Sequence, residues 1–491
     1  MPYIQGENRE QMTLIPLCLD DYIGSDSICR VIAVYVGSLD MSALGFKYGE
    51  TKDTGRPPFS PSSMLMLYLY GYLNRIRSSR RLESETKRNV EVMWLMKKLT
   101  PDDKTISNFR KDNAPSLKKV FRNFSLWCSR EGLYGKELVV VDGSKIRADS
   151  SRRNIHTQKG TEKELASVEK KINEYMSELE RNDTAEADET RLSPSAIREI
   201  LERLNAKKDT LQDWLKKIAA NEGKEISVVD PDAHMMHTNG DGRNLDACYN
   251  VQSVVDGKHK LIVDFDVSTC PDDSGALSLM TESAKTIMGV DEIAVTADKG
   301  YYDGSDIERC EQNGTACYVP KTGDYAHAPN RRYDQSHFRY DKENDCYICP
   351  EGQTLSFRQL QLSKRKGSTE SIETGRVYYD NRVCRVCPNK AKCTVNKRDG
   401  RKIYRNLKQD TLDVVNARMR TAEGREILRE RKKIVEHPFG TTKAVWGYRQ
   451  FLCRGREKTT AEMSLTFLAY NLRRVFNIFK ENDKNLTEML V

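Results

Sequence analysis

Hydrophobic positions in the first 130 residues follow the three- to four-residue spacing of helices. In the stretch "SPSSMLMLYLYGYLNRIR", Ser60 is a plausible N-cap and Pro61 suits the first helical position. Apolar side chains then recur at helical spacing, at Leu65, Leu69, Tyr72 and Ile76. Similar patterns predict helices over about 81–98 and 103–128. The pattern therefore predicts an all-α N-terminal region.

The pattern changes after residue 135, where strands become the better interpretation. Residues 138–141 form a continuous apolar run of β-branched character, typical of a strand buried on both faces, and the run ends in Asp142 and Gly143. Residues 161–220 return to helical spacing with many charges, which predicts an antiparallel helical hairpin inserted between strands. Two further strands follow, "DACYNVQSVVD" and "KHKLIVDFDVS", and the Asp256-Gly257 turn between them predicts an antiparallel hairpin.

The remaining elements complete a mixed α/β pattern. A helix is expected around Leu277 and Ala284, and Asp272 and Asp273 before it are most simply interpreted as N-caps. The stretch "DEIAVTADKGYYDG" predicts a short strand that ends in Asp298, and "TACYVP" predicts another. A long helix is expected over 410–437. The fold class expected from this order is α/β with a mixed sheet.

Length and composition are those of a multidomain globular protein. The chain has 491 residues, of which 38% are hydrophobic and 31% charged, and its length suggests two to four domains. It has no apolar run long enough to span a membrane, and its start lacks the layout of a signal peptide. We therefore expect a soluble, cytoplasmic protein in which the 13 cysteines stay reduced.

Positive charge is concentrated in two blocks of the sequence. Residues 71–130 hold 15 Lys and Arg against 6 Asp and Glu, and residues 351–410 hold the same numbers. Residues 161–220 hold 11 basic against 14 acidic residues. Two basic blocks separated by an acidic one suggest a polyanion contacted in more than one place, although solvated charged surfaces would give the same composition.

Within the first basic block, a short helix has side chains suited to reading DNA. Its polar residues fit phosphates and base edges, as a recognition helix requires, although a polar surface helix is the alternative. The expected DNA contacts in this block are Arg77, Arg80, Arg81 and Arg110, and the polar residues of the helix are Thr105, Ser107 and Asn108.

Three acids stand at the ends of the expected elements. Asp142 and Asp298 each close a short buried strand, with a glycine within two residues, and such strand ends converge in mixed sheets. Two carboxylates held together repel each other unless a cation joins them, and hard oxygen ligands suit Mg²⁺ or Mn²⁺. Cleavage of a phosphodiester by in-line attack needs charge stabilised on both the attacking and the leaving oxygen, which two metal ions can do. The third acid is expected from the late helix, where Glu436 stands in "IVEHPFGTTK".

These stretches resemble the insertion-sequence DDE transposases. The resemblance rests on "VVVDGSKI", "YNVQSVVD", "ADKGYYD" and "VEHPFGTTK", with further likeness over roughly residues 55–475. The family signature Tyr-x2-Arg-x3-Glu-x6-Lys is met in its second half by Glu436 and Lys443. Its first half differs, because Lys432 stands at the arginine position and Arg429 at the tyrosine position.

The resemblance implies a ribonuclease H-like catalytic domain that carries Asp142, Asp298 and Glu436 as ligands of Mg²⁺ or Mn²⁺. It further implies binding to terminal inverted repeats in double-stranded DNA, cleavage at the ends of the element, and joining of the freed 3′-OH to target DNA. Lys443, Lys432 and Arg429 are then expected at the phosphates. Because transposition usually holds two ends together, a homodimer is expected on DNA, where the protein would be nucleoid-associated.

The domain organisation expected from these patterns has four parts. They are a basic helical DNA-binding domain (1–130), the first part of the catalytic domain (131–335, with the hairpin at 160–225), a Cys-rich insertion (336–409), and the rest of the catalytic domain with the glutamate helix and a C-terminal helix (410–491).

Five cysteines in the insertion have the spacing of a metal site. "CYIC" and "CRVCPNKAKC" give Cys-x2-Cys, a 34-residue gap and Cys-x2-Cys-x5-Cys, and paired Cys-x2-Cys in a reduced compartment is a strong signal for structural zinc. Four of the five thiolates are needed, and we prefer Cys346, Cys349, Cys384 and Cys387, with Cys393 able to replace one of the second pair. An iron-sulfur cluster and a metal-free module are the alternatives. Arg358, Lys364, Arg365 and Lys366 between the pairs suggest a small zinc-ribbon-like insertion that faces DNA.

The function expected from the sequence is therefore Mg²⁺-dependent DNA cleavage and strand transfer of an insertion sequence. Two other functions fit the same residues. One is a DNA-binding protein on the same scaffold that no longer cuts, and the other is a Mg²⁺-dependent nuclease without strand transfer.

Overall fold

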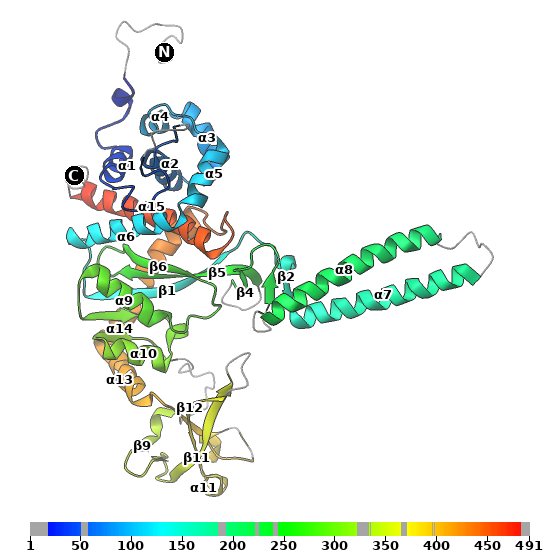
Figure 1. The fold of residues 1–491 in the computed structure, drawn as a ribbon. Coiled ribbons are helices and arrows are strands. Elements are labelled where there is room, and N and C mark those ends of the chain that lie inside the picture. Colours follow the sequence, from blue (N-terminus) through cyan, green and yellow to red (C-terminus); the bar gives the residue numbers. More distant parts are fainter. Residues whose placement is uncertain are drawn as a thin grey trace, which may run out of the picture.

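The computed structural model describes residues 18–50, 57–184, 193–220, 225–238, 244–321, 333, 335–364, 371–394, 396 and 398–482. Figure 1 shows a stack of three parts: helices of the N-terminal region, a central sheet with its helices, and a smaller β-rich module. A helical hairpin projects sideways from the central part. Arg365 and Lys366, expected to face DNA, lie outside the described residues. No helix in the described ranges is both long and apolar enough to cross a membrane.

The central sheet is mixed, which confirms the expected α/β class. Its strands lie in the order β4-β5-β1-β7-β8, and β6 also pairs with β5. β1 runs parallel to β7 and β7 parallel to β8, whereas β5 is antiparallel to β1, β4 and β6. The strands are β1 (Leu138–Arg147), β4 (His234–His237), β5 (Leu245–Asp256), β6 (Ile262–Ser268), β7 (Ile293–Thr296) and β8 (Thr315–Tyr318).

Strand β1 is longer than the sequence predicts. It does not end at Asp142 but continues to Arg147, because its whole length pairs with β5. Its parallel pairing with β7 covers residues 138–140 alone. Asp142 therefore lies beyond the parallel register while still inside a strand.

The helices that cover the sheet come from distant parts of the sequence. The described helical elements between β6 and β8 are α9 (Ala276–Met288), the 3-10 turn η3 (Lys299–Tyr301) and α10 (Gly304–Gln312). After the β-rich module come α13 (Gln409–Arg420), α14 (Ala422–Phe439), the π-helical turn η5 (Gly440–Val445) and α15 (Arg456–Glu481). The single helix expected over 410–437 is thus two, because Thr421 is extended and caps α14 by accepting a hydrogen bond from the Gly424 N–H.

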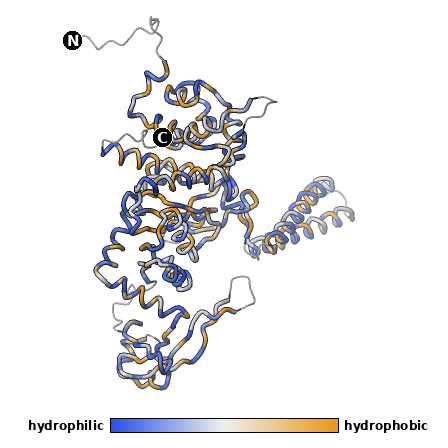
Figure 2. The backbone as a smooth tube through the Cα atoms, turned by 60° about the vertical axis from the view of Figure 1, so that its left-hand side comes forward, coloured by the Kyte–Doolittle hydropathy of each residue, from blue (hydrophilic) through white to orange (hydrophobic). Residues whose placement is uncertain are grey.

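The N-terminal helices share one hydrophobic core with the sheet. The cluster runs without interruption from helix α1 through the strands to α15, and α15 packs against both α2 and α6. Figure 2 shows hydrophobic and hydrophilic stretches alternating along the helices and strands of these stacked parts. The helices are α1 (Ile28–Gly37), α2 (Pro61–Leu73), α3 (Ser79–Arg88), α4 (Val90–Leu95), α5 (Asp103–Asp112) and α6 (Ala114–Arg130), preceded by the 3-10 turn η1 (Leu19–Tyr22). The two helices expected over 81–98 and 103–128 are each divided, with breaks at Asn89 and Asn113.

A helical hairpin is inserted between β1 and β5. It consists of α7 (Gln158–Thr184) and α8 (Pro194–Ala220), which pack against each other around Val168, Ile172 and Leu211. A two-stranded ribbon of β2 (Ile155–Thr157) and β3 (Glu225–Ser227) stands at its base, after the short turn η2 (Arg152–Asn154). Figure 1 shows the hairpin reaching away from the rest of the molecule.

The Cys-rich insertion forms its own five-stranded antiparallel sheet, with the order β13-β12-β11-β10-β9. Its core is small and consists of Phe338, Tyr347, Leu355, Tyr378 and Ile403. The strands are β9 (Arg339–Asp341), β10 (Cys346–Ile348), β11 (Thr354–Lys364), β12 (Ser371–Tyr378) and β13 (Ile403–Asn406), and the short helices are η4 (Gln335–His337), α11 (Asn381–Arg385) and α12 (Lys390–Cys393).

Candidate active site

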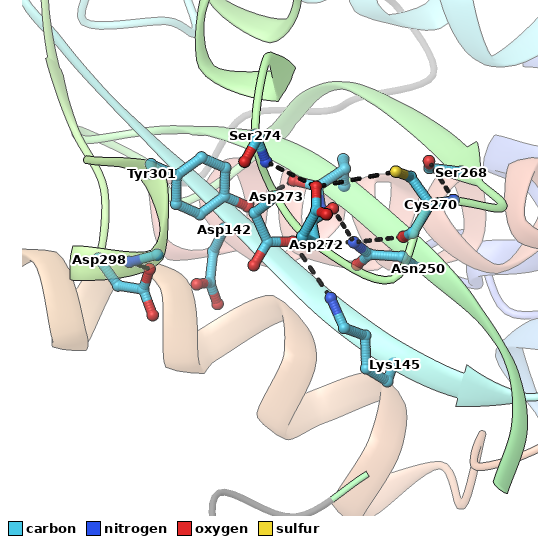
Figure 3. A network of polar contacts seen from close by, with 12 residues as sticks. Asp142, Lys145, Asn250, Ser268, Cys270, Asp272, Asp273, Ser274, Asp298 and Tyr301 are labelled. Carbon is cyan, nitrogen blue, oxygen red and sulfur yellow. Dashed lines mark hydrogen bonds and ion pairs between the residues drawn. The ribbon is translucent and has the colours of Figure 1, made fainter. Parts of the chain in front are cut away.

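The register of the two parallel strands places Asp142 and Asp298 side by side. The last parallel pair joins Val140 to Thr296. Asp142 comes two residues after Val140, and Asp298 comes two residues after Thr296. Because side chains alternate between the two faces of a strand, the two-residue step puts the acids on the same side. Figure 3 shows both carboxylates pointing toward the helix below them, which is α14. This helix contacts β1, β7 and β8.

Asp142 lies in a mostly buried and strongly charged environment. Burial raises its pKa to about 7; Arg431 opposes the rise, whereas Asp298 and Asp273 add to it. Arg431 Nη1 stands 3.8 Å from Asp142 Oδ1. Two negative charges beside a buried carboxylate are costly without a counter-charge, and Arg431 supplies part of it.

Asp298 is held by its own turn. Its Oδ1 accepts a hydrogen bond from the Gly300 N–H at 2.7 Å, so that the residue caps η3. The same turn carries Tyr301, whose hydroxyl donates a hydrogen bond to Gln252 Oε1 on β5. The aspartate side chain is thus oriented by the short turn that follows β7.

Asp273 is a third acid at this place, and its interpretation as an N-cap is wrong. Helix α9 is capped by Gly275, and no side chain caps it. Asp273 Oδ1 instead accepts hydrogen bonds from Lys145 Nζ, Asn250 Nδ2 and Gln252 Nε2 at 3.2, 2.8 and 2.7 Å (Figure 3). The sequence carried one signal for this role, since "PDDSG" supplies two acids before a helix that needs one cap.

Glu436 reaches this part of the molecule on α14, but it does not complete a metal site. Its side chain is exposed, and among the described residues it makes no hydrogen bond or ion pair. No group of three or more Asp, Glu, His or Cys side chains in the described part of the chain is arranged to hold a metal ion. The structure therefore brings Asp142 and Asp298 together with Asp273, and leaves Glu436 outside that group.

The helical path from Glu436 to Lys443 is continuous. Helix α14 runs through Pro438 to Phe439 and passes directly into the π-helical turn η5. Single π turns are frequent at functional sites. Lys443 Nζ donates a hydrogen bond to the Lys145 carbonyl at 2.9 Å, and burial lowers the pKa of Lys443 to about 8. Lys443 therefore lies against β1, close to Asp142.

The basic residue of α14 that reaches the aspartates is Arg431, which the sequence analysis missed. Lys432 is exposed, and Arg429 is exposed and paired with Glu426 at 2.9 Å. Its position in the helical repeat was the signal that could have identified it. Arg431 precedes the buried Val435 by four residues, whereas Lys432 precedes the exposed Glu436 by four.

The expected DNA contacts of the N-terminal region have different environments. Arg110 is 8% exposed; its Nη1 donates to the Tyr72 hydroxyl at 3.3 Å and its guanidinium lies over the Tyr68 ring. Its side chain therefore packs inward from the apolar side of α5, and its role as a DNA contact stays a prediction. Arg77 is also engaged internally, since it donates to the Gln450 carbonyl at 3.0 Å.

Two other arginines of that block remain accessible. Arg81 is exposed, and Arg80 is 88% exposed, with its Nε 3.4 Å from Asp103 Oδ2. The polar residues of α5 keep solvent contact, since Ser107 and Asn108 are exposed. A DNA surface on this region would thus use these residues.

In the Cys-rich module, four thiols surround one small cavity of about 30 Å³, roughly the space of one water molecule. The four are Cys349, Cys384, Cys387 and Cys393. Burial raises the pKa of Cys384 and of Cys393, and in both cases the neighbouring thiols add to the rise. Cys346 does not line the cavity, and the charges that act on it are Asp341, Asp345 and Arg339.

The four cysteines that line the cavity therefore differ from the four preferred as zinc ligands from the sequence. Alternation along β10 turns Cys346 away from the cavity, whereas Cys393 on α12 takes its place. Within the described residues, the four thiols are not arranged as a formed metal site.

Two models of known protein families match separate parts of the chain. A family model described as a transposase DDE domain matches residues 348–476, which include Glu436 and Lys443. A second model, a transposase domain (DUF772), matches residues 17–112, which include α1 to α5. Neither match includes Asp142 or Asp298. A search of curated proteins found no match to the chain. Two transposase models that match separate parts of one chain support an insertion-sequence DDE transposase.

Proposed function

We propose that the protein cleaves the ends of an insertion sequence and joins them to target DNA, with Asp142, Asp298 and Glu436 as its catalytic acids. The observation that carries the proposal is the register of β1 and β7, which aligns the two aspartates two residues beyond their last parallel pair. The matches to two transposase models support the class of reaction, and the register of this chain supports the choice of the two aspartates.

The catalytic part would have a ribonuclease H-like fold. In support, three antiparallel strands (β6, β5 and β1) are followed across the sheet by two parallel ones (β7 and β8), with α9 in the connection between β6 and β7. Asp142 and Asp298, which both lie just beyond the parallel pairing of β1 with β7, would then meet at the same place on the sheet.

The donor set fits Mg²⁺ or Mn²⁺. Carboxylate oxygens are the preferred ligands of both ions, and a buried Asp142 beside two more acids is a place where a cation relieves repulsion. Asp142 and Asp298 would hold the metal, and Glu436 would join them from α14 when metal and DNA are present. The bound ions would stabilise negative charge on the attacking and leaving oxygens of the phosphodiester.

The basic residues around the acids would position the DNA. Lys443 and Arg431 stand beside Asp142 and would contact the phosphates flanking the scissile bond, while the exposed Lys432 and Arg429 would follow the backbone outward. Arg80 and Arg81 would contact DNA with the N-terminal helices. Two copies of the chain would hold the two ends of the element.

The experiment combines purified protein with DNA that carries the element's terminal inverted repeats, plus Mg²⁺ and a target plasmid. We expect cuts at the element ends and covalently joined products, both absent in EDTA. Cuts without joined products would establish the nuclease instead. Tight, salt-dependent binding without any cut would establish a DNA-binding protein that no longer cleaves.

We also propose that Cys349, Cys384, Cys387 and Cys393 bind a structural zinc ion. The five-residue core of the module is small for a sheet of five strands, and small cores commonly need a metal for stability. Two sulfur atoms already accept backbone N–H groups, as zinc thiolates do: Cys349 from Gln353 at 3.4 Å, and Cys384 from Arg401. The thiols would move together onto the ion as they lose their protons.

Cys393, which is in this ligand set, and Cys346, which is not, provide a matched pair of variants. Cys393→Ser should lower the zinc content of purified protein from one ion per chain to near zero, because a structural site needs all four ligands. Cys346→Ser should leave it at one, and metal analysis by mass spectrometry measures both. Equal zinc content in the two variants, or none in the wild type, would refute this ligand set.

A further inference from the structure

Gly143, the residue after Asp142, is enclosed by side chains from three other elements. A Cβ atom at this position would lie 2.5 Å from Gln252 Nε2, 2.8 Å from Asp273 Oδ1 and 3.0 Å from the Tyr301 hydroxyl. Gly143 is paired with Gln252 across β1 and β5, so the register itself brings Gln252 to this point. The three side chains therefore occupy the space that a larger residue would need.

These side chains are joined to one another in a chain of hydrogen bonds. Tyr301 donates to Gln252 Oε1, and Gln252 Nε2 donates in turn to Asp273 Oδ1 at 2.7 Å. Tyr301 is 1% exposed and Gln252 is 2% exposed, so that solvent does not compete for these bonds. The bonded chain connects the turn η3, the strand β5 and the loop before α9.

The same bonded chain adjoins the backbone next to both candidate catalytic aspartates. At one end it packs on Gly143, next to Asp142. At the other end Tyr301 belongs to the turn that Asp298 caps, and a Cβ at Gly300 would lie 2.9 Å from Asp298 Oδ1 and 3.4 Å from Asp273 Oδ2. Figure 3 shows Asp142 between Asp298 and Asp273, with Tyr301 beside them.

We propose that Asp273, Gln252 and Tyr301 are positioning residues that fix Asp142 and Asp298 relative to each other. This inference rests on the proposed function, because it assumes that the two aspartates bind a metal ion together. Side chains that orient metal ligands typically change metal affinity 10–100-fold when they are removed. Asp273 is anchored for this task by Lys145 and Asn250, which hold its Oδ1 from two further strand positions.

The test measures Mn²⁺ binding to DNA-free protein, from the electron paramagnetic resonance signal of the unbound ion. Asp273→Ala and Tyr301→Phe should each weaken binding about tenfold. The double variant should be little weaker than either single one, because both act through Gln252. Asp273→Asn should keep most of the affinity, since its amide oxygen still accepts from Asn250 and Gln252. Asp272→Ala is the matched control and should bind as the wild type, because the Asp272 carboxylate accepts hydrogen bonds from the Cys270 thiol and the Ser274 N–H, outside the chain of bonds through Gln252.

Thermal melting of the metal-free variants shows whether a loss of Mn²⁺ affinity comes from a loss of folded protein. If Asp273→Ala does not fold, Tyr301→Phe still tests the proposal, because it removes a single hydroxyl. Unchanged Mn²⁺ affinity in Tyr301→Phe and Asp273→Ala would overturn the proposal. Equal losses in Asp273→Asn and Asp273→Ala would overturn the positioning role in favour of direct metal ligation. A wild type that binds Mn²⁺ through Asp142 yet fails to cut DNA would refute the proposed function and leave this inference standing.

Discussion

Asp142→Asn and Asp298→Asn should each lower the rate of end cleavage about a thousandfold while leaving binding to the terminal repeats nearly unchanged. The expected size follows from metal ions contributing several kcal/mol to the transition state, at a factor of ten for each ~1.4 kcal/mol. Asparagine keeps the shape of aspartate and removes the charge that holds the cation. Gel-based cleavage assays and a DNA-binding titration measure the two quantities.

The control for this prediction is Asp266→Asn. Asp266 lies on β6 and pairs with Arg456 at 3.1 Å, so it is a charged strand residue outside the site. It should cleave as the wild type does. If both catalytic-site variants retained the wild-type rate, Asp142 and Asp298 would not be the catalytic pair.

Glu462→Ala should lower the free energy of unfolding by about 3–5 kcal/mol, the cost of breaking a buried ion pair from one side. Glu462 is 0% exposed; its Oε2 accepts from the N–H groups of Leu452 and Cys453 at 2.9 and 3.1 Å, and its Oε1 is 3.4 Å from Arg77 Nη1. Arg77 also lies over the Tyr448 ring, and this contact connects the N-terminal helices to the segment before α15. Urea unfolding followed by circular dichroism measures the change.

Glu457→Ala is the comparison variant for Glu462→Ala. Glu457 is exposed in the first turn of the same helix, and surface substitutions usually change stability by within about 0.5 kcal/mol. Equal unfolding midpoints for the two variants would mean that the carboxylate of Glu462 does not hold these parts together.

The sequence predicted the elements well where one pattern dominated. The apolar run at 138–141, the Asp256-Gly257 turn and the helical spacing at 161–220 each correspond to an element of the structure. The boundaries were less predictable, because they depend on tertiary pairing: β1 continues to Arg147 since β5 lies alongside it. The break at Thr421 was also missed, because a threonine cap inside a polar helix gives little signal.

The candidate site was also only partly predictable from the sequence, because some of its residues meet only through tertiary contacts. Asp142 and Asp298 were visible in sequence because each follows a short apolar run, and the register then aligns them. Asp273, Gln252 and Tyr301 were not selected, because their roles depend on contacts between elements far apart in the chain. The inward packing of Arg110 was not predicted either, because composition does not tell which side of a helix faces the core.

The ligand set of the Cys-rich module likewise depends on the tertiary structure. Spacing identified the module, but it could not choose four sulfurs out of five. The choice depends on strand alternation, which turns Cys346 to one side of β10, and on the short helix that brings Cys393 to the cavity.

The central claim is that Asp142, Asp298 and Glu436 meet at one metal centre when the protein holds DNA. Replacing Mg²⁺ by Fe²⁺ in the protein–DNA complex and adding ascorbate and peroxide produces hydroxyl radicals at the metal, and these cut the nearest backbone. Mass spectrometry of the fragments should show cuts clustered near residues 142, 298 and 436, suppressed by excess Mg²⁺. Cuts near 142 and 298 without any near 436 would contradict the claim.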